Sequence, residues 1–340
     1  MKPRVLKIDP QNIDPELIRQ AADVIRKGGL VAFPTETVYG LGANALDPAA
    51  VTGIFGAKNR PLDDPLIVHI AEIEDLKRLA KEVPEEATKL VDRFWPGPLT
   101  VVLKKTEEVP ELVTTGLDTV AIRMPSNPIA RELINTSGVP IAAPSANLFG
   151  RPSPTRARHV VDDLDGRIDL VLDGGSAEIG IESTVVEFIE GKVIVLRPGG
   201  IDVESLCSVI GDVHIYKGTE EMERSPGKYP QHYSPHAMVI VVDESGSQAE
   251  KVRMAAESMT SKGKRVGIMA KEEHAGEYRS YDVKILGPEN VGRACALNLF
   301  HILREFDSEN VDVIIAEAIP EKGLGLAVMN RLRKAAGPGS

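Results

Sequence analysis

Residues 33–45, FPTETVYGLGANA, combine features that suit a ligand-binding site. The apolar run at 30–33 has the composition of a short buried strand, and Pro34 ends it. Hydroxyl and acidic side chains follow at 35–37, and two glycines lie beyond them. Such a strand end can present hydroxyls to a ligand, and glycines allow close backbone approach. A strand-to-helix turn with incidental threonines fits the same letters, and the local pattern does not separate the two.

Four separated cations could hold an anionic ligand. Lys58 and Arg60 stand two apart in KNRP, beside prolines that exclude regular structure. If this segment is extended, both cations point to one side and could straddle a polyphosphate; a solvated basic turn is the alternative. Arg123 lies in the apolar run 119–123 and needs an anionic partner, which either the protein or a ligand could supply. Arg197 ends a further strand-like run, beside a proline and two glycines.

Hydroxyl and amide side chains alternate with these cations. Ser145 and Asn147 follow the apolar run 139–142, and Ser183 precedes the run 184–188. Local capping of turns explains serine and asparagine at such positions equally well. His69 lies inside the apolar LIVHI, where a histidine more commonly belongs to the core than to a ligand site.

Several familiar mechanisms have no counterpart in the sequence. It lacks a Gly-x-x-x-x-Gly-Lys-Ser/Thr phosphate loop, a Gly-x-Ser-x-Gly elbow and a His-Glu-x-x-His motif. The seven histidines and two cysteines show no metal-ligand spacing. The cations and hydroxyls instead indicate a polyanionic substrate held by positioning and electrostatics, without a covalent protein nucleophile.

The elements that must position these residues alternate between strands and helices. The range 14–27 has the apolar periodicity of an amphipathic helix. Strands are expected at 30–33, 66–70, 99–103, 119–123, 139–142, 169–172, 184–188 and 193–196, and further helices at 48–57, 73–81, 84–93, 127–136 and 155–162. This pattern predicts one α/β domain with a large mixed sheet.

The organisation changes after about residue 210. Residues 218–236 hold three prolines, two tyrosines and two histidines, which is typical of a linker or a binding loop. Strands are expected beyond it at 238–243, 265–270, 283–286 and 311–318, with helices at 247–262, 289–306 and 325–336. Such alternation predicts a parallel sheet covered on both faces. We therefore divide the chain into a catalytic domain (1–210), a linker or lid (211–236) and a smaller Rossmann-like domain (237–340).

Length and composition agree with a two-domain enzyme. A chain of 340 residues exceeds the size at which one core keeps growing. The net charge of -10 argues against the whole surface binding nucleic acid. Cys207 and Cys295 are too few for a disulfide framework. The N-terminus lacks the apolar core of a signal peptide, and no apolar run approaches the ~18–20 residues that span a bilayer. We expect a cytoplasmic protein.

Eight sequence blocks follow one another in a specific order: FPTETVYGLGANA, KNRP, PLIVHI, FWPGPLT, AIRMP, PSAN, ESTVVEF and LRPGG. Together they resemble the threonylcarbamoyl-adenylate synthases in their two-domain form. The resemblance covers about residues 10–205 and extends to the linker and the C-terminal part. It implies an open mixed sheet of the YrdC type, joined by a linker to a smaller Rossmann-like parallel α/β domain of the Sua type.

The resemblance also implies a reaction, in which L-threonine, bicarbonate and ATP are joined. A carbamate of threonine attacks the α-phosphate of ATP, pyrophosphate leaves, and threonylcarbamoyl-AMP forms. A separate transferase complex then uses this product to modify the adenosine next to the anticodon of certain tRNAs; direct tRNA binding by this chain stays open. Magnesium is expected through the ATP phosphates, without a metal site built from the protein alone.

Residue roles follow from the same resemblance. The catalytic candidates, expected on the leaving pyrophosphate, are Lys58 and Arg60. The ATP-binding candidates are Arg60, Asp64, Thr119, Ser145, Asn147, Ser153, Arg197 and Ser234. The candidates for L-threonine are Thr37, His69, Arg123, Ala143 and Ser183, with Arg123 expected to pair with the substrate carboxylate.

Some positions depart from the family pattern. Asp64 stands where asparagine is expected, and a carboxylate near phosphates would repel them unless magnesium intervenes. Glu187 replaces the more usual aspartate. The linker segment 225–235 carries its motif in a shifted register, and in relatives this linker folds over the active site as a lid. We expect Tyr229, His232, Tyr233 or Ser234 to contact the nucleotide, since closure would exclude water from a labile mixed anhydride.

Two other functions stay open at this point. Arg151, Arg156 and Arg158 cluster near the expected rim of the sheet and could serve an RNA-binding module, whose affinity would fall steeply with salt and need no threonine. An ATP hydrolase or a nucleotidyltransferase with another acceptor would release phosphate or pyrophosphate whether or not threonine is present.

Overall fold

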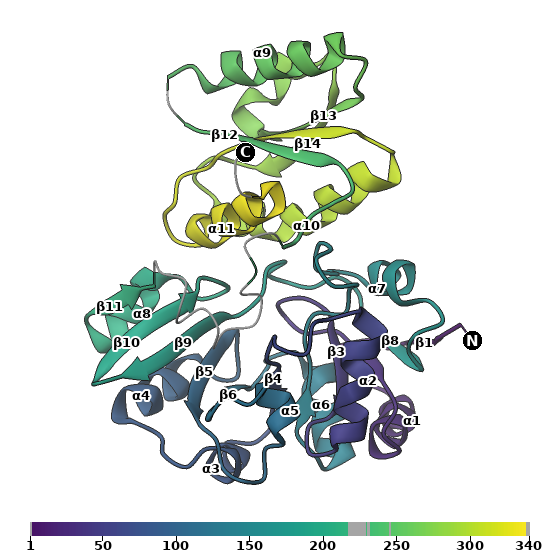
Figure 1. The fold of residues 1–340 in the computed structure, drawn as a ribbon, viewed down its shortest axis with the longest axis vertical. Helices are drawn as coiled ribbons and strands as arrows, with labels where there is room; N and C mark the ends of the chain where they lie inside the picture. Colours follow the sequence, from purple (N-terminus) through teal and green to yellow (C-terminus); the bar gives the residue numbers. More distant parts are fainter. Residues whose placement is uncertain (1, 217–228, 230–231, 245, 338–340) are drawn as a thin grey trace. The chain divides into compact units, whose positions relative to one another are not determined.

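The computed structural model describes residues 2–216, 229, 232–244 and 246–337. The chain divides into two compact units, which are coloured along the sequence in Figure 1. Unit 1 comprises Met1–Phe149, Pro154–Glu178 and Glu182–Lys228, and unit 2 comprises Gly150–Ser153, Ile179–Ile181 and Tyr229–Ser340. Two short segments that precede residue 210 thus group with unit 2. No helix in the described part of the chain is long and apolar enough to cross a membrane.

Unit 1 is built on one sheet of eleven strands, in which parallel and antiparallel neighbours both occur. The order across the sheet is β1-β8-β2-β3-β7-β4-β6-β5-β9-β10-β11. The strands are β1 (Arg4–Lys7), β2 (Val31–Phe33), β3 (Gly40–Asn44), β4 (Ile67–His69), β5 (Leu99–Lys104), β6 (Thr119–Arg123), β7 (Ile141–Ala142), β8 (Leu170–Asp173), β9 (Thr184–Ile189), β10 (Lys192–Arg197) and β11 (Val213–Ile215). The predicted large mixed sheet is confirmed.

The helices of unit 1 begin where the sequence supplies caps. Asp14 accepts a hydrogen bond from the Glu16 amide, and Pro15 takes the first helical position of α1. Asp47 and Pro48 start α2 in the same way, and Asn59 in a left-handed conformation ends it. The helices are α1 (Pro15–Arg26), α2 (Pro48–Lys58), α3 (Glu74–Leu79), α4 (Glu85–Phe94), α5 (Glu111–Thr114), α6 (Pro128–Ser137), α7 (Ala157–Leu164) and α8 (Val203–Ile210).

The glycine-rich stretch after Phe33 is a strand, which the sequence did not lead us to expect. β3 pairs with β2 in antiparallel fashion, so Phe33 stands opposite Gly40. A Cβ atom on Gly42 would lie 2.7 Å from Ile141 Cγ2 and from a carbon of the Phe33 ring. Gly42 is therefore needed for close packing within the unit. The alternative of a strand-to-helix turn was wrong. Close approach of a ligand to the glycines stays a prediction.

The predicted linker also begins later than expected. Residues 213–215 form β11, which pairs in parallel with β10 at the edge of the sheet. The elements β1, α5 and α8 were not predicted, since each is short and carries little periodicity.

Unit 2 contains a parallel sheet of four strands in the order β12-β15-β13-β14. The strands are β12 (Met238–Val242), β13 (Val266–Lys271), β14 (Asp282–Gly287) and β15 (Val313–Glu317). Helix α9 (Gln248–Ser261) covers one face, whereas α10 (Gly292–Ser308) and α11 (Gly325–Ala336) cover the other (Figure 1). A 3₁₀ segment, η2 (Glu272–Tyr278), follows β13. The predicted parallel α/β domain is confirmed.

Candidate functional site

A row of polar side chains crosses three neighbouring strands of unit 1. Arg123 at the end of β6 stands in register with His69 at the end of β4 on one side and with Thr100 of β5 on the other. Residues in register on neighbouring strands share a face of the sheet, so these three side chains form one line. All three are buried. The sheet thereby assembles residues that lie far apart in the sequence.

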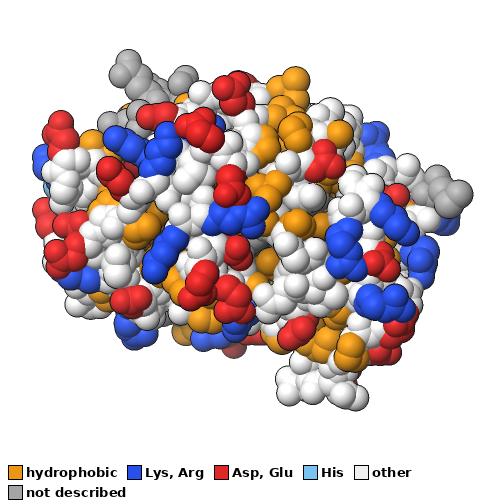
Figure 2. Space-filling view, turned by 90° about the horizontal axis from the view of Figure 1, so that it is seen from below, with side chains coloured by type: hydrophobic (Ala, Val, Ile, Leu, Met, Phe, Trp, Pro, Cys, Tyr) orange, Lys and Arg blue, Asp and Glu red, His pale blue; other side chains and the backbone are white. Residues whose placement is uncertain are grey.

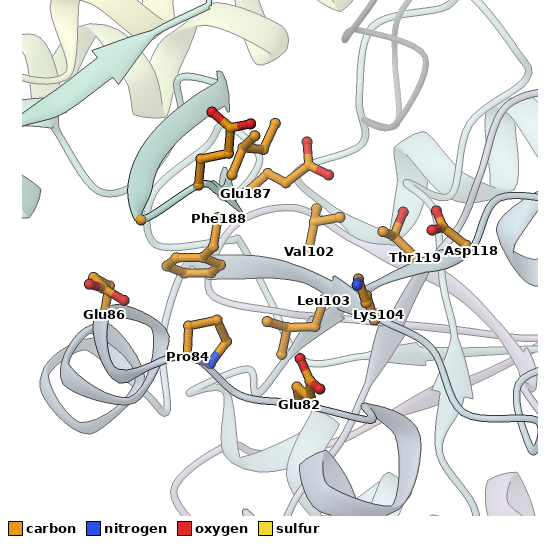
Figure 3. Close-up of a pocket in the computed structure, with 13 residues that line it drawn as sticks. Glu82, Pro84, Glu86, Val102, Leu103, Lys104, Asp118, Thr119, Glu187 and Phe188 are labelled. Carbon is orange, nitrogen blue, oxygen red and sulfur yellow. The ribbon is translucent and has the colours of Figure 1, made fainter.

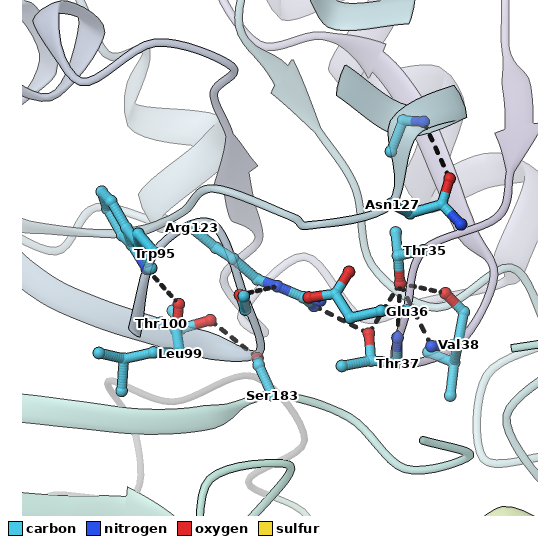
Figure 4. Close-up of polar contacts among 12 residues, drawn as sticks. Thr35, Glu36, Thr37, Val38, Trp95, Leu99, Thr100, Arg123, Asn127 and Ser183 are labelled. Carbon is cyan, nitrogen blue, oxygen red and sulfur yellow. Dashed lines mark hydrogen bonds and ion pairs between the residues drawn. The ribbon is translucent and has the colours of Figure 1, made fainter. Parts of the chain in front are cut away.

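The guanidinium of Arg123 has partners on the loop after β2 (Figure 4). Nη2 donates to Glu36 Oε1 at 2.6 Å and Nη1 donates to Thr37 Oγ1 at 2.9 Å. Nε lies 3.3 Å from the carbonyl oxygen of Gly97. These contacts use three of the five N–H groups, which leaves two that could meet a carboxylate. The protein thus supplies one anionic partner, Glu36, without exhausting the donors of Arg123.

The loop that carries Glu36 is fixed by hydroxyl hydrogen bonds. Thr35 Oγ1 donates to the carbonyl of Val38 at 2.6 Å and accepts from the Val38 amide at 3.3 Å. Thr37 Oγ1 lies 2.7 Å from Thr35 Oγ1. Glu36 is only 2% exposed, and its Oε2 atom has no hydrogen-bond partner among the described residues. Sequence reasoning placed Thr37 in the site and passed over its neighbour Glu36.

His69 is uncharged near neutral pH. Burial, followed by the nearby charge of Arg123, lowers the pKa of His69 to about 3. Its Nδ1 atom has no hydrogen-bond partner among the residues that the structure describes. The site therefore contains two buried polar atoms, on Glu36 and His69, that lack a hydrogen-bond partner among the described residues.

Ser183 joins the two sets of predicted ligand contacts. Its Oγ lies 2.8 Å from Thr100 Oγ1 and 3.2 Å from Nη2 of Arg197, which also donates to the Ser183 carbonyl at 3.0 Å. Ser183 was predicted to face threonine and Arg197 to face ATP, and the structure brings them into contact. Ala143 is buried after β7, where its amide donates to the carbonyl of Ile67 at 2.9 Å.

An apolar floor lies beside the polar row, and it was not predicted as part of the site. Ala121 stands in register with Ile67 on one side and with Val102 on the other, two residues from the polar row along each strand. These three residues form one cluster with Val185 and Leu196. The period-2 alternation of the strands could have identified this floor from the sequence. An apolar cluster beside hydrogen-bonding groups suits a nucleobase.

Thr119 lies at the far end of the same face. It begins β6 in register with Lys104 and lines a cavity of about 430 Å³ (Figure 3). Val102, Glu187 and Phe188 line the same cavity. Its volume falls in the range of about 300–1,000 Å³ that is usual for small-molecule sites.

The predicted catalytic pair does not have the extended geometry that we expected. Lys58 is the last residue of α2, and Asn59 has a φ of 53°, so the chain turns sharply between the two cations. Lys58 Nζ donates to the backbone carbonyls of Ser145 and Asn147, which gives these two predicted residues a shared lysine. The extended Lys-x-Arg geometry was therefore wrong, while the roles of both cations stay predictions.

Arg60 forms an ion pair with Asp64, which stands where the family pattern has asparagine. Nη2 of Arg60 lies 2.9 Å from Asp64 Oδ2 and 2.9 Å from the carbonyl oxygen of Pro65. Both side chains are almost fully buried. Because Asp64 pairs with Arg60, its carboxylate repels phosphate less strongly than an isolated carboxylate would.

The remaining nucleotide and lid candidates belong to unit 2. Ser153 is buried, and Ser234 donates through Oγ to the carbonyl of Ala335 at 3.2 Å and through its amide to that of Gly150 at 2.7 Å. The ring of Tyr233 packs 5.3 Å from that of Phe300. The linker residues 217–228 and 230–231 lie outside the described part. The predicted nucleotide contacts of the residues named here stay predictions.

The other two lid candidates differ in burial. His232 is buried, and its ring packs edge-on against Tyr233 with 4.0 Å between centroids. Tyr229 is half-buried. Contact of these two side chains with the nucleotide stays a prediction.

No group of three or more histidine, cysteine or acidic side chains among the described residues is arranged to hold a metal ion. Glu36 and Asp64 each pair with an arginine.

Family models match nearly the whole chain. The Sua5–YciO–YrdC family model, described as "Telomere recombination", matches residues 23–199, and the model for "Threonylcarbamoyl-AMP synthase, C-terminal domain" matches 201–337. A threonylcarbamoyl-AMP synthase of Pyrococcus abyssi is 52% identical over 96% of both chains. One of Bacillus subtilis is 49% identical over 95% of this chain and 94% of its own.

Solved structures support the same family. A crystal structure of P. abyssi Sua5 complexed with L-threonine has a TM-score of 0.91 at 49% identity and covers 98% of this chain and 97% of its own. Escherichia coli YciO has a TM-score of 0.54 at 28% identity and covers 60% of this chain and 99% of its own. The open mixed sheet of unit 1 is thus of the YrdC type. The chain belongs to the family of two-domain threonylcarbamoyl-AMP synthases.

Proposed function

We propose that this protein synthesises threonylcarbamoyl-AMP from L-threonine, bicarbonate and ATP. The observation that supports the proposal is one face of the sheet of unit 1, on which the polar row of Arg123 adjoins the apolar floor of Ala121. The P. abyssi relative that binds L-threonine matches this chain over almost its full length, which supports threonine as the amino acid.

Threonine would bind along the row of Arg123. Two N–H groups of Arg123 remain for the substrate carboxylate, and an arginine suits this planar acceptor better than a lysine. Thr37 offers a hydroxyl that contacts Arg123, and Ser183 offers one that contacts Thr100 in the same row. His69, being neutral, adds a hydrogen-bonding group without adding charge beside Arg123.

ATP would lie across the apolar floor, with its base toward Thr119 and its phosphates toward the cations. Arg60, Lys58 and Arg197 would neutralise the phosphate charge, and Ser145, Asn147 and Ser153 would add hydrogen bonds. We propose that magnesium accompanies ATP through its phosphate oxygens and lowers their charge during the reaction. Ser234 and the lid residues Tyr229, His232 and Tyr233 are the candidates for shielding the product.

The chemistry needs positioning rather than a protein nucleophile. The amine of threonine takes up carbon dioxide from bicarbonate and becomes a carbamate. A carbamate oxygen then attacks the α-phosphorus of ATP, the bond to the bridging oxygen breaks, and pyrophosphate leaves with the electron pair. Arg60 and Lys58 would stabilise the charge that develops on the leaving group. A separate transferase complex would pass the threonylcarbamoyl group to tRNA.

Pyrophosphate release from ATP tests this function, with threonine and bicarbonate left out in turn. Release that needs both substrates is the expected result. Release that is indifferent to threonine would overturn the proposal in favour of a nucleotidyltransferase with another acceptor.

An RNA-binding module has less support. Arg151, one of the three arginines considered for it, forms a 2.7 Å ion pair with Asp307. On the face seen in Figure 2, basic side chains lie among acidic ones and form no continuous basic field among the described residues. Absence of pyrophosphate release, together with salt-sensitive RNA binding, would reverse this preference.

A further inference from the structure

The loop after β2 carries a buried carboxylate that no assigned role explains. Glu36 is 2% exposed, and its Oε1 accepts from Arg123 at 2.6 Å. Oε2 has no hydrogen-bond partner among the described residues. A buried carboxylate oxygen without a donor is costly, since it has lost water and gained nothing in return. If the pair with Arg123 were only structural, a donor for the second oxygen would be expected as well.

The loop gives this carboxylate little freedom to find a donor elsewhere. Thr35 closes the turn through Val38, and the Glu36 carbonyl accepts from the Glu178 amide at 3.1 Å. The neighbouring Thr37 is held by Arg123. The polypeptide therefore fixes the backbone on both sides of Glu36, and its second oxygen is left for a ligand.

We propose that Glu36 binds the α-ammonium group of the amino-acid substrate and takes a proton from it. This inference rests on the proposed function. An α-amino acid carries its carboxylate and its ammonium group on the same carbon. The Arg123–Glu36 pair presents the complementary charges next to each other. Arg123 would hold the carboxylate with its two remaining N–H groups, while Glu36 Oε2 accepts from the ammonium.

Proton transfer is required because an ammonium has no lone pair with which to attack carbon. Glu36 takes one proton and becomes a neutral acid, and the amine forms the N–C bond to carbon dioxide, which bicarbonate yields together with hydroxide. The nitrogen then loses a second proton to that hydroxide, which becomes water. Ammonium, bicarbonate and the Glu36 carboxylate thus give carbamate, water and the Glu36 acid, with atoms and charge balanced.

His69 supports this placement. Its buried Nδ1 also lacks a partner among the described residues, and its strand position is in register with Arg123. Two unpartnered polar atoms beside one guanidinium are what a site for a multiply hydrogen-bonding ligand requires. A purely structural ion pair would not need a second such atom next to it.

The test compares Glu36→Gln with wild type by calorimetric binding of L-threonine and of its analogue with hydroxyl in place of the α-ammonium. Glutamine keeps an oxygen for Arg123 but turns N–H groups toward the ammonium. We expect threonine affinity to fall about 10- to 100-fold, the factor of one charge-assisted hydrogen bond. The analogue and ATP should bind within about threefold of wild type. Equal losses for threonine and the analogue would overturn the proposal.

The pH profile separates proton transfer from mere positioning. At saturating threonine, turnover of Glu36→Gln should approach that of wild type as pH rises, because the free amine then forms without a base. If the ratio of the two turnover rates stays constant across pH, Glu36 does not accept the proton. Glu178→Gln is the matched control, since it removes an exposed carboxylate from the residue that contacts the Glu36 backbone.

Two further measurements test the inference if Glu36→Gln does not fold or if wild type lacks the proposed activity. If Glu36→Gln does not fold, wild type alone must bind threonine at least about tenfold more tightly than the analogue, and Glu36→Asp should retain part of that preference. Equal binding of both ligands by wild type overturns the inference. If wild type releases no threonine-dependent pyrophosphate, it is the proposed function that fails; if wild type does so and Glu36→Gln behaves like it, only the role of Glu36 fails.

Discussion

Two buried glutamates, one in each unit, differ in how completely they are hydrogen-bonded. Glu317 ends β15 and is fully buried. Its Oε1 accepts from the Tyr278 hydroxyl at 2.7 Å and pairs with His274 Nδ1 at 2.6 Å, and its Oε2 accepts from the Lys271 amide at 2.6 Å. Glu36 in unit 1 has one partner, Arg123, and an oxygen without a donor among the described residues.

The difference teaches how to separate a structural charge from a ligand-binding one. The three donors of Glu317 come from one short segment, Lys271 and η2, so this network ties the end of β15 to the segment after β13. Both carboxylate oxygens of Glu317 therefore have protein partners. The network around Glu36 is incomplete by one donor, and it adjoins the apolar floor that suits a nucleobase.

The largest effect is expected for Arg123→Ala, which removes the cation from the incomplete network. Threonine affinity should fall by about 100-fold or more, because the substrate carboxylate loses its partner and Glu36 is left as an uncompensated buried charge. ATP affinity should change far less. Calorimetric titration with each ligand measures both, and Arg19→Ala is a control that removes an exposed arginine of α1. Equal loss of threonine and ATP binding would contradict the carboxylate role.

Glu317→Ala should act on stability instead. Three donors in unit 2 would lose their acceptor, which should lower the free energy of unfolding by about 3 kcal/mol. Calorimetric unfolding measures this, with the exposed Glu272→Ala as control. Threonine-dependent pyrophosphate release per folded molecule should stay at the wild-type level. If the Glu317→Ala protein is as stable as wild type and its pyrophosphate release depends differently on threonine, Glu317 is not a purely structural residue.

A smaller effect is expected for His69→Gln, and it depends on pH. The native pKa of about 3 lies below the unfolded value near 6.5, so between these values the unfolded chain binds a proton that the native protein does not. Wild type should therefore lose up to about 1.4 kcal/mol of stability per pH unit from this group as pH falls below 6.5. The variant should lack this contribution. Parallel stability curves for the two proteins between pH 5 and 7 would show that His69 is not buried in its neutral form.

Sequence periodicity predicted most long elements to within a few residues. The strand at 119–123 and the helix at 325–336 have the predicted bounds, and 14–27 forms the helix Pro15–Arg26. Short elements at sheet edges, such as β1 and β11, carry too few residues for a period to show. β3 was missed because its glycines favour a loop in any local interpretation, although they serve packing against Phe33 and Ile141.

The sequence by itself determined which residue types the protein has for its chemistry: separated cations, hydroxyls at strand ends, and apolar strands that alternate with helices. These properties are local, since they depend on periodicity and on residues close in the chain. The tertiary structure alone decided which charges meet. Strand register placed Arg123 beside His69 and Thr100, and the loop after β2 brought Glu36 to it across 87 positions of sequence. Register is set by packing of the whole sheet, so no short stretch of sequence can reveal which buried oxygen is left for a ligand.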